Sequence, residues 1–184
     1  MNKTKIYNLR IVPPEPMLQE IVQIKRQFEV AFGRQPLSRS KPHITLAKFE
    51  MYPEDEEILL KYFGQLSEFK KFQIGIQGFD IFENKSNTLY IKVLNTEEIK
   101  KIHTQLKILW IRDFHKELRS IKIASTPHIT ISKTDGNKML RESLDYFQEK
   151  EYVRQFEVSQ LTLVSRKEYK TWDWEYQIEL KADF

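Results

Sequence analysis

The sequence has no cysteine and no long uninterrupted hydrophobic stretch. The absence of cysteine rules out disulfide bonds, thiolate nucleophiles and cysteine-bound metals, and it fits a reducing compartment. No apolar run reaches the length that spans a bilayer. The N-terminal stretch MNKTKIYNLRIVPPEP lacks the apolar core of a signal peptide. We therefore expect a cytoplasmic protein that does not associate with a membrane.

The chain has 184 residues, of which 40% are hydrophobic and 30% are charged. This length suits one domain or two small lobes that share a core, and the composition is typical of a folded protein. The formal net charge is only +4, from 30 basic and 26 acidic residues. Such a small excess is compatible with a phosphate-bearing or nucleic-acid partner but does not require one.

Two stretches of the sequence closely resemble each other. SKPHITLAKFE begins at Ser40, and STPHITISKTD begins at Ser125, 85 residues later. They share Ser, Pro, His, Ile, Thr and Lys at matching positions, and they contain two of the four histidines of the chain. A core packing role favours apolar residues, whereas PHIT places polar groups at alternate positions. The pattern indicates a duplicated unit whose polar pair serves a function.

Each half of the chain predicts the same order of elements: strand, helix, histidine-bearing strand, helix and strand. Gly33 ends the first long helix, and the glycines of KKFQIGIQGFDIF indicate a β-bulge. We therefore expect an α+β fold of two pseudo-two-fold related lobes, with antiparallel sheets and flanking helices around a central cleft. The lobes would cover about residues 1–85 and 86–184 of a single domain, with terminal strands free to cross between them.

The histidine and the threonine of each repeat are two residues apart, so on a strand they point to the same face. His43 and Thr45 form one such pair, and His128 and Thr130 form the other. In-line displacement at phosphorus needs a base near the attacking oxygen and an acid near the departing oxygen. Histidine can fill either role near neutral pH, and the hydroxyls can donate to the non-bridging oxygens. This arrangement needs no metal ion and no cofactor.

The paired PHITL and PHITI resemble the signature of the two-histidine (2H) phosphoesterase superfamily, which includes 2′-5′ RNA ligase-like proteins and cyclic nucleotide phosphodiesterases. The resemblance implies a bilobal fold and metal-independent chemistry on 2′,3′-cyclic phosphates or 2′-5′ phosphodiester linkages of RNA or nucleotides. It implies catalytic roles for His43 and His128 and phosphate-holding roles for Thr45 and Thr130. It does not tell which histidine is the acid and which is the base.

Three further residues are candidates for binding substrate. Arg39 belongs to the basic loop GRQPLSRSK, which precedes the first motif and is placed to contact a phosphate or an RNA backbone. Arg166 and Tyr169 follow the strand-like LTLVS, where the resemblance implies basic and aromatic residues that hold phosphate and stack a base. The expected partners are therefore RNA ends or nucleotide cyclic phosphates, bound by a monomer.

Other conspicuous residues favour structural roles. Strict alternation puts Lys48 and Lys133 on the face opposite the histidines, which favours solvated lysines, although a β-bulge would reverse this direction. Trp172, Trp174 and Tyr176 alternate along the last predicted strand and favour a core-facing stripe over a base-stacking platform.

Three alternatives to this interpretation stay open, one of which is a related fold that acts on a sugar or another metabolite. KTDG, at residues 133–136, matches the lysine motif of ATP-dependent ligases, but Asp135-Gly136 is more typical of a turn before a helix. A non-catalytic module that binds RNA or nucleotide phosphate in the same cleft is the main alternative to an enzyme.

The other histidines, His103 and His115, lack metal-ligand spacing and predict surface or helix-packing roles.

Overall fold

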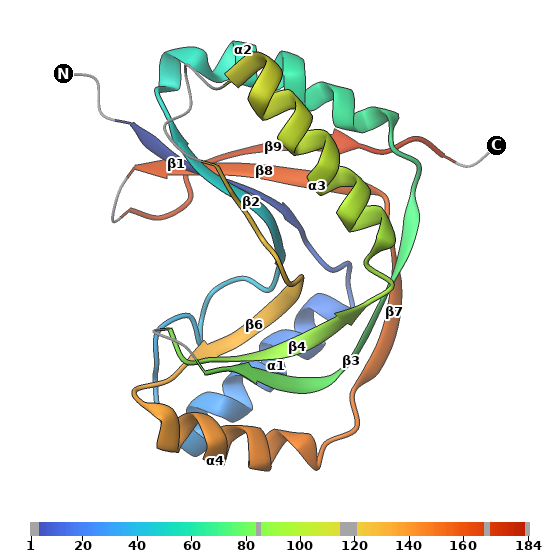
Figure 1. The fold of residues 1–184 in the computed structure, drawn as a ribbon. Helices are drawn as coiled ribbons and strands as arrows, with labels where there is room; N and C mark the ends of the chain where they lie inside the picture. The colour runs from blue at the N-terminus through green and yellow to red at the C-terminus, as the bar shows by residue number, and fades with distance from the viewer. Residues whose placement is uncertain (1–3, 84–85, 115–120, 168–169, 183–184) are drawn as a thin grey trace.

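The computed structural model describes residues 4–83, 86–114, 121–167 and 170–182. Its strands form one curled antiparallel sheet, whose main path runs β7-β3-β4-β6-β2-β1-β8-β9, while β5 pairs with β2 outside this path (Figure 1). The strands are β1 (Lys5–Ile11), β2 (Ile44–Met51), β3 (Phe72–Phe82), β4 (Thr88–Leu94), β5 (Ile121–Ile123), β6 (His128–Lys133), β7 (Val153–Val158), β8 (Gln160–Lys167) and β9 (Trp174–Glu179). The predicted α+β class, with an antiparallel sheet and flanking helices, is confirmed.

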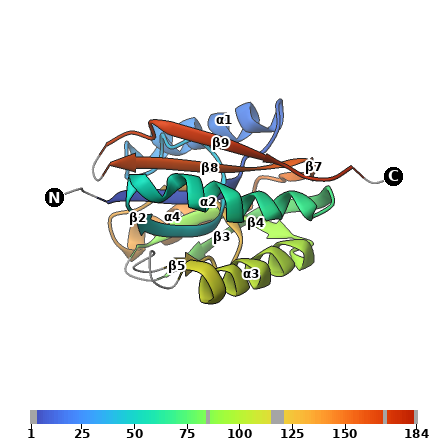
Figure 2. The same ribbon diagram turned by 90° about the horizontal axis from the view of Figure 1, so that it is seen from above.

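The helices lie on the outer side of the curled sheet. They are α1 (Met17–Phe32), α2 (Glu56–Phe63), α3 (Glu97–Leu109) and α4 (Asn137–Gln148), with short helical turns at Pro53–Asp55, Gly64–Glu68 and Trp110–Phe114. In Figure 1, α2 and α3 lie over one half of the sheet, and α1 and α4 lie against the other half; Figure 2 views the molecule from the side of α2 and α3. No helix of the described ranges covers the inner, concave face of the sheet. Among the same residues, none of the helices combines the length and the apolar character that a membrane crossing requires.

Local sequence signals explain where several elements begin, end or bend. The apolar stripe of α1 buries Ile21 and Phe28 completely, and Gly33 then takes a φ of 76°, which glycine adopts without strain. In β3, Gly78 has a φ of 61°, and the register with β4 shifts between Ile76 and Phe79. The predicted bulge in this strand is therefore confirmed.

Each lobe combines segments from both halves of the chain. One lobe consists of β2, β1, β8 and β9, and the other consists of β6, β4, β3 and β7. The helices are exchanged in the same way, because α1 packs on β6 whereas α3 packs on β2. A boundary near residue 85 therefore does not separate the lobes: β3 lies beside β4, and the C-terminal strands β8 and β9 complete the lobe of β1.

The two histidine-bearing strands meet at the centre of the sheet. β2 and β6 pair through Ile44 and Ile129, and both isoleucines are fully buried. Because successive side chains of a strand point to opposite faces, the neighbours of these isoleucines face the inner surface. The two isoleucines therefore pack on the face opposite the histidines.

Candidate active site

The four polar residues of the paired motif come together at the junction of β2 and β6. His43 and Thr45 flank the residue of β2 that pairs with β6, and His128 and Thr130 flank its partner. All four are partly exposed, and strand alternation turns them to the inner face of the sheet. Because the two strands are antiparallel, His43 lies toward Thr130 and Thr45 lies toward His128.

Both imidazole rings are oriented by the same kind of hydrogen bond. Nδ1 of His43 lies 2.8 Å from the carbonyl oxygen of Lys41, and Nδ1 of His128 lies 2.7 Å from that of Thr126. A carbonyl oxygen only accepts, so Nδ1 carries the proton of each neutral ring and Nε2 keeps a free lone pair. Nε2 is therefore the atom through which each histidine can take or give a proton.

The electrostatic surroundings of the two histidines differ. Burial is the main cause that lowers the pKa of His43, and together with the positive charges of Arg10 and Lys25 it brings this pKa to about 4. The pKa of His128 is also lowered by burial, but without a contribution from these cations. In both cases the bond to a backbone carbonyl acts in the opposite direction. His43 is therefore neutral at neutral pH in the free protein.

Lys48 lies on the inner face with Thr45, so the prediction of a lysine on the opposite face is wrong. Along the β1–β2 ladder, Arg10 pairs with Thr45 and Asn8 pairs with Lys48, with a shift of register between the two pairs. Arg10 and Asn8 are two residues apart and share a face, so their partners share that face as well. The cause is a β-bulge, in which one extra residue reverses the alternation of the strand.

The second repeat contains the same bulge, and the same correction applies to Lys133. Tyr90 pairs with Thr130 and Thr88 pairs with Lys133 across a shift of the β4–β6 register. The pKa of Lys48 is lowered by burial first and then by several positive neighbours, Lys133 among them. The two lysines thus bring positive charge to the inner face from both lobes.

Each bulge is held from the outer side by a buried helical side chain. Nζ of Lys25 on α1 donates to the carbonyl oxygens of Thr130 and Ile131, at 2.9 and 2.7 Å. On the other lobe, His103 of α3 is bonded to the backbone of Leu46. Lys25 is 2% exposed and His103 is 9% exposed, so the expected packing role of His103 is observed. His115 lies outside the described residues.

The sequence contains a weak signal for Lys25 and His103, the two side chains that anchor the bulges. The segment IVQIKRQF of α1 aligns with IKKIHTQL of α3, so that Lys25 and His103 occupy the same place in an I-x-x-I-x-x-Q pattern. The similarity is weaker than that of the PHIT motifs because the two anchoring residues are different amino acids. The two aligned positions correspond in the structure because α1 packs on β6 and α3 packs on β2, the two histidine-bearing strands.

The residues beside the two motifs make the lobes chemically different. The threonine of the first motif has Arg10 as its strand neighbour, whereas the threonine of the second has Tyr90. Tyr90 stacks on Phe82 with ring centroids 4.2 Å apart, and both rings contact His128 edge-on at 5.2 and 5.0 Å. Burial first, and then the nearby Asp80, raise the pKa of Tyr90 to about 12. One side of the site is therefore cationic and the other side is aromatic.

Of the further candidates, Arg166 reaches the inner face. It pairs with Ile6 on β1, four residues before Arg10, and its guanidinium lies 4.8 Å from the ring centroid of Trp172. Trp172 and Tyr176 are each 38% exposed, so the prediction of a core stripe is wrong for these two aromatics. Trp172 precedes β9, and the β8–β9 pairing of the described residues ends at Trp174. Tyr169 lies outside the described residues.

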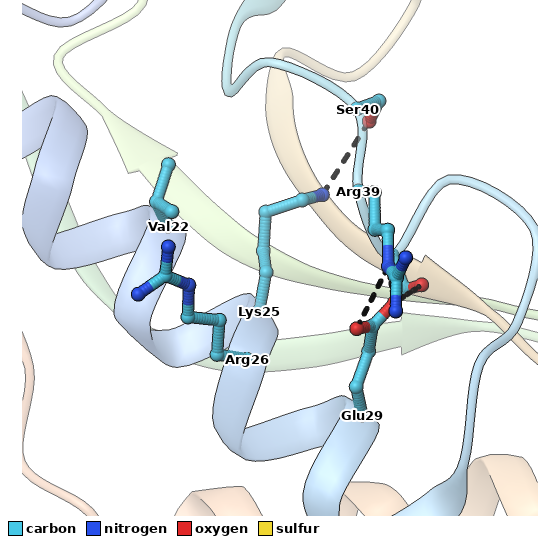
Figure 3. Close-up of a pocket in the computed structure, with 7 residues that line it drawn as sticks. Val22, Lys25, Arg26, Glu29, Arg39 and Ser40 are labelled. Carbon is cyan, nitrogen blue, oxygen red and sulfur yellow. Dashed lines mark hydrogen bonds and ion pairs between the residues drawn. The ribbon is translucent and has the colours of Figure 1, made fainter.

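Arg39 takes part in a different feature. Its Nε lies 2.8 Å from Oε1 of Glu29 on α1, and its side chain is 64% exposed. Figure 3 shows this pair beside Lys25, which reaches toward Ser40. The pocket that these residues line has a volume of about 360 Å³, and neither histidine of the motif belongs to its lining. The structure therefore engages Arg39 with α1 rather than with His43.

Most of the chain matches a known protein family. The model of the 2′-5′ RNA ligase superfamily matches residues 13–170, a range that includes both histidine motifs. The chain therefore belongs to this superfamily, that of the 2H phosphoesterases. A curated relative, "Putative phosphoesterase OB1230" of Oceanobacillus iheyensis, is 27% identical over 104 residues, which cover 54% of this chain. The match spans 57% of the length of that relative.

Solved structures share the fold at low sequence identity. The apo form of E. coli LigT is 14% identical, with a TM-score of 0.68 over 95% of this chain and 98% of its own. TT0787 of Thermus thermophilus is 15% identical, with a TM-score of 0.66 over 96% and 99% of the two chains. Usb1 of Kluyveromyces marxianus with uridine monophosphate gives a TM-score of 0.54 at 15% identity, over 98% and 100%. These likenesses establish a LigT-like fold.

Proposed function

We propose that this protein is a metal-independent phosphodiesterase that cleaves 2′,3′-cyclic phosphates or 2′-5′ phosphodiester linkages of RNA or nucleotides. The observation that carries the proposal is the arrangement at the β2–β6 junction. Two imidazoles with free Nε2 atoms and two threonine hydroxyls share one face of the sheet there. In-line displacement at phosphorus needs a base and an acid on opposite sides of the reacting atom, together with donors to the non-bridging oxygens.

His43 acts as the general base in this mechanism. Its neutral Nε2 takes a proton from water while the water oxygen attacks phosphorus. Protonated His128 donates its Nε2 proton to the ribose oxygen as the P–O bond breaks, which leaves a phosphomonoester and a free hydroxyl. Support for this assignment comes from Arg10, which favours the uncharged form of His43. His128, whose pKa is lowered by burial, lacks that contribution and is easier to protonate.

The negative charge of the phosphoryl group is held by donors from both lobes. Thr45 and Thr130 are placed to donate to non-bridging oxygens, and Lys48 and Lys133 add positive charge nearby. Nδ2 of Asn8 lies 3.5 Å from Oγ1 of Thr45. The amide can only donate to that oxygen, so the hydroxyl proton of Thr45 stays available for the substrate.

Ligands of structurally similar proteins support the substrate class. E. coli LigT has been solved in complex with 3′-AMP, and Kluyveromyces marxianus Usb1 with uridine monophosphate. Both ligands are nucleoside monophosphates, and 3′-AMP is a product that opening 2′,3′-cyclic AMP can yield. These proteins are 16% and 15% identical to this chain, so the ligand class enters here as part of the proposal.

The test is a substrate screen with EDTA present throughout. Purified protein is incubated with 2′,3′-cyclic nucleotides, a 2′-5′-linked dinucleotide and an ADP-ribose cyclic phosphate, and phosphomonoester products are measured. We expect turnover of at least one class, and a loss of about 10²- to 10⁴-fold in His43→Ala and in His128→Ala. Circular dichroism checks that the variants fold. Normal turnover in both variants overturns the proposal, and binding without any product leaves the non-catalytic module.

A further inference from the structure

The lobe that contains His43 has a group of charged and aromatic side chains whose hydrogen-bonding capacity the proposed cleavage does not use. Cζ of Arg10 lies 4.6 Å from the ring centroid of Trp172, and Cζ of Arg166 lies 4.8 Å from the same centroid. Arg10 is only 3% exposed, whereas Trp172 is 38% exposed. Two guanidinium groups are thus held against one indole ring on the inner face, which orients them and leaves the ring accessible.

Among the residues that the structure describes, neither guanidinium group has a partner for one of its buried N–H donors. Nε of Arg10 donates to Oδ1 of Asn8 at 3.2 Å, while its buried Nη2 has no hydrogen bond. Nη1 of Arg166 donates to the carbonyl oxygen of Lys170 at 3.0 Å, while its buried Nε has none. Buried donors in native proteins are nearly always satisfied, so unsatisfied donors on two guanidinium groups that contact the same ring indicate an acceptor that is supplied from outside the chain.

The charges around the group indicate that this acceptor is an anion. Burial and, to a smaller extent, the like charge of Arg166 lower the pKa of Arg10 to about 10, although Glu175 acts in the opposite direction. Within the described ranges neither arginine forms an ion pair with a carboxylate. The carboxylate of Glu175 instead accepts a hydrogen bond of 2.6 Å from Nε2 of Gln177. A bound anion would satisfy both guanidinium groups and offset their repulsion.

We propose that Arg10, Arg166 and Trp172 form a second phosphate subsite, which binds a phosphate group adjacent to the one that is cleaved. Arg10 lies beside Thr45 at the β2–β6 junction, and Arg166 lies beside Ile6, four residues back along β1. Both guanidinium groups nevertheless reach the ring of Trp172, so the subsite lies on the cationic lobe next to the β2–β6 junction. Guanidinium groups suit phosphate because their planar donors bind two oxygens at once.

This inference rests on the proposed function and narrows its substrate class. The preferred substrate would carry a second phosphate, either the 5′-phosphate of a nucleotide or the next phosphodiester of an RNA chain. An unphosphorylated nucleoside 2′,3′-cyclic phosphate would use only the junction of β2 and β6. The aromatic pair Phe82 and Tyr90, on the opposite lobe, leaves the cationic side as the place for this additional charge.

The experiment compares three substrates: 2′,3′-cyclic AMP, the same compound with a 5′-phosphate, and a diadenosine that ends in a 2′,3′-cyclic phosphate. We expect kcat/KM to be about tenfold higher for one or both phosphorylated substrates in the wild type. The ratio should fall to near one in Arg166→Gln and in Trp172→Ala. Arg141→Gln removes the same charge from the exposed outer face of α4 and should leave the ratio unchanged. Which of the two phosphorylated substrates is preferred identifies the source of the second phosphate.

A binding measurement keeps this inference separate from the proposed function. Adenosine 3′,5′-bisphosphate and 3′-AMP are titrated into the wild type and into Arg166→Gln by calorimetry. Tighter binding of the bisphosphate that depends on Arg166 supports the subsite even if no substrate is cleaved, in which case only the proposed function fails. Equal affinities in the wild type, or a preference that survives Arg166→Gln, overturn the subsite whatever the turnover.

Discussion

The two lobes place the same motif in different surroundings. In both, the histidine is oriented by a carbonyl two residues earlier, and a bulge turns a lysine onto the inner face. The neighbouring strand then differs, because Arg10 lies beside Thr45 whereas Tyr90 lies beside Thr130. Duplication accounts for two equivalent imidazoles. The flanking strands make them unequal, and a reaction that needs one base and one acid requires that inequality.

The largest expected difference between His43 and His128 depends on the leaving group of the substrate. A nitrophenyl phosphodiester releases a weakly basic phenolate, which needs no proton from the enzyme. With this substrate His128→Ala should recover most of its activity relative to the wild type, whereas His43→Ala should keep a loss of about 10²- to 10⁴-fold. Steady-state kcat/KM measures both. The reverse pattern would assign the acid to His43 and the base to His128.

The anchors behind the bulges provide the second comparison. Lys25 holds two carbonyl oxygens of β6, whereas His103 is bonded to the backbone of one residue of β2. Lys25→Met should therefore lower kcat by about tenfold or more through misplacement of Thr130, and His103→Leu should have a smaller effect. Equal losses of kcat in Lys25→Met and His103→Leu would show that these two anchors are not the source of the difference between the lobes.

The same lysine makes a prediction about stability. Burial lowers the pKa of Lys25 from its ordinary value to about 7. Between that pH and about 10.4 the unfolded chain binds a proton that the folded chain does not, so the free energy of unfolding rises with pH over this window. Urea titrations of the wild type at pH 7 and pH 9 should show the rise relative to Lys25→Met. A constant difference between the two proteins would argue against the buried position of the amine.

The two inner-face lysines should behave alike, because the same bulge positions each of them. Lys48→Met and Lys133→Met should each lower kcat/KM by up to about tenfold and reduce the salt dependence of substrate binding by about one ion. Lys138→Met provides a matched control, since this lysine is on α4 with 91% of its side chain exposed. If either inner-face variant matches Lys138→Met, that lysine does not contact the substrate.

The smallest expected effect is a change in the acid limb of the pH profile. In the free enzyme kcat/KM should fall on acidification as His43 becomes protonated near pH 4, the pKa to which burial and Arg10 lower it. Arg10→Gln removes a positive neighbour, so the pKa of His43 should rise and the acid limb should move to higher pH, by about one pH unit. Arg141→Gln should not move it. An unchanged limb in Arg10→Gln would place the arginine too far away to act on His43.

Local patterns predicted part of this molecule well. The β-bulge of β3 and the end of α1 follow from Gly78 and Gly33, because glycine conformations are decided within a few residues. The faces of the sheet on which Lys48 and Lys133 lie were predicted wrongly, because a local pattern does not decide them. Each depends on one extra residue in a strand, and alternation from the histidine onward does not reveal where that residue is inserted.

The sequence by itself determined the family, the paired His-x-Thr motif and its placement on one face of two strands, because spacing along a strand is a local property. Only the tertiary structure decided how the two halves interleave, since strand pairing is non-local. It brought Arg166 of β8 to the side of β1 and set Trp172 against both Arg10 and Arg166. Residues so distant in the chain have no common periodicity, and only the packing of one curled sheet makes them neighbours.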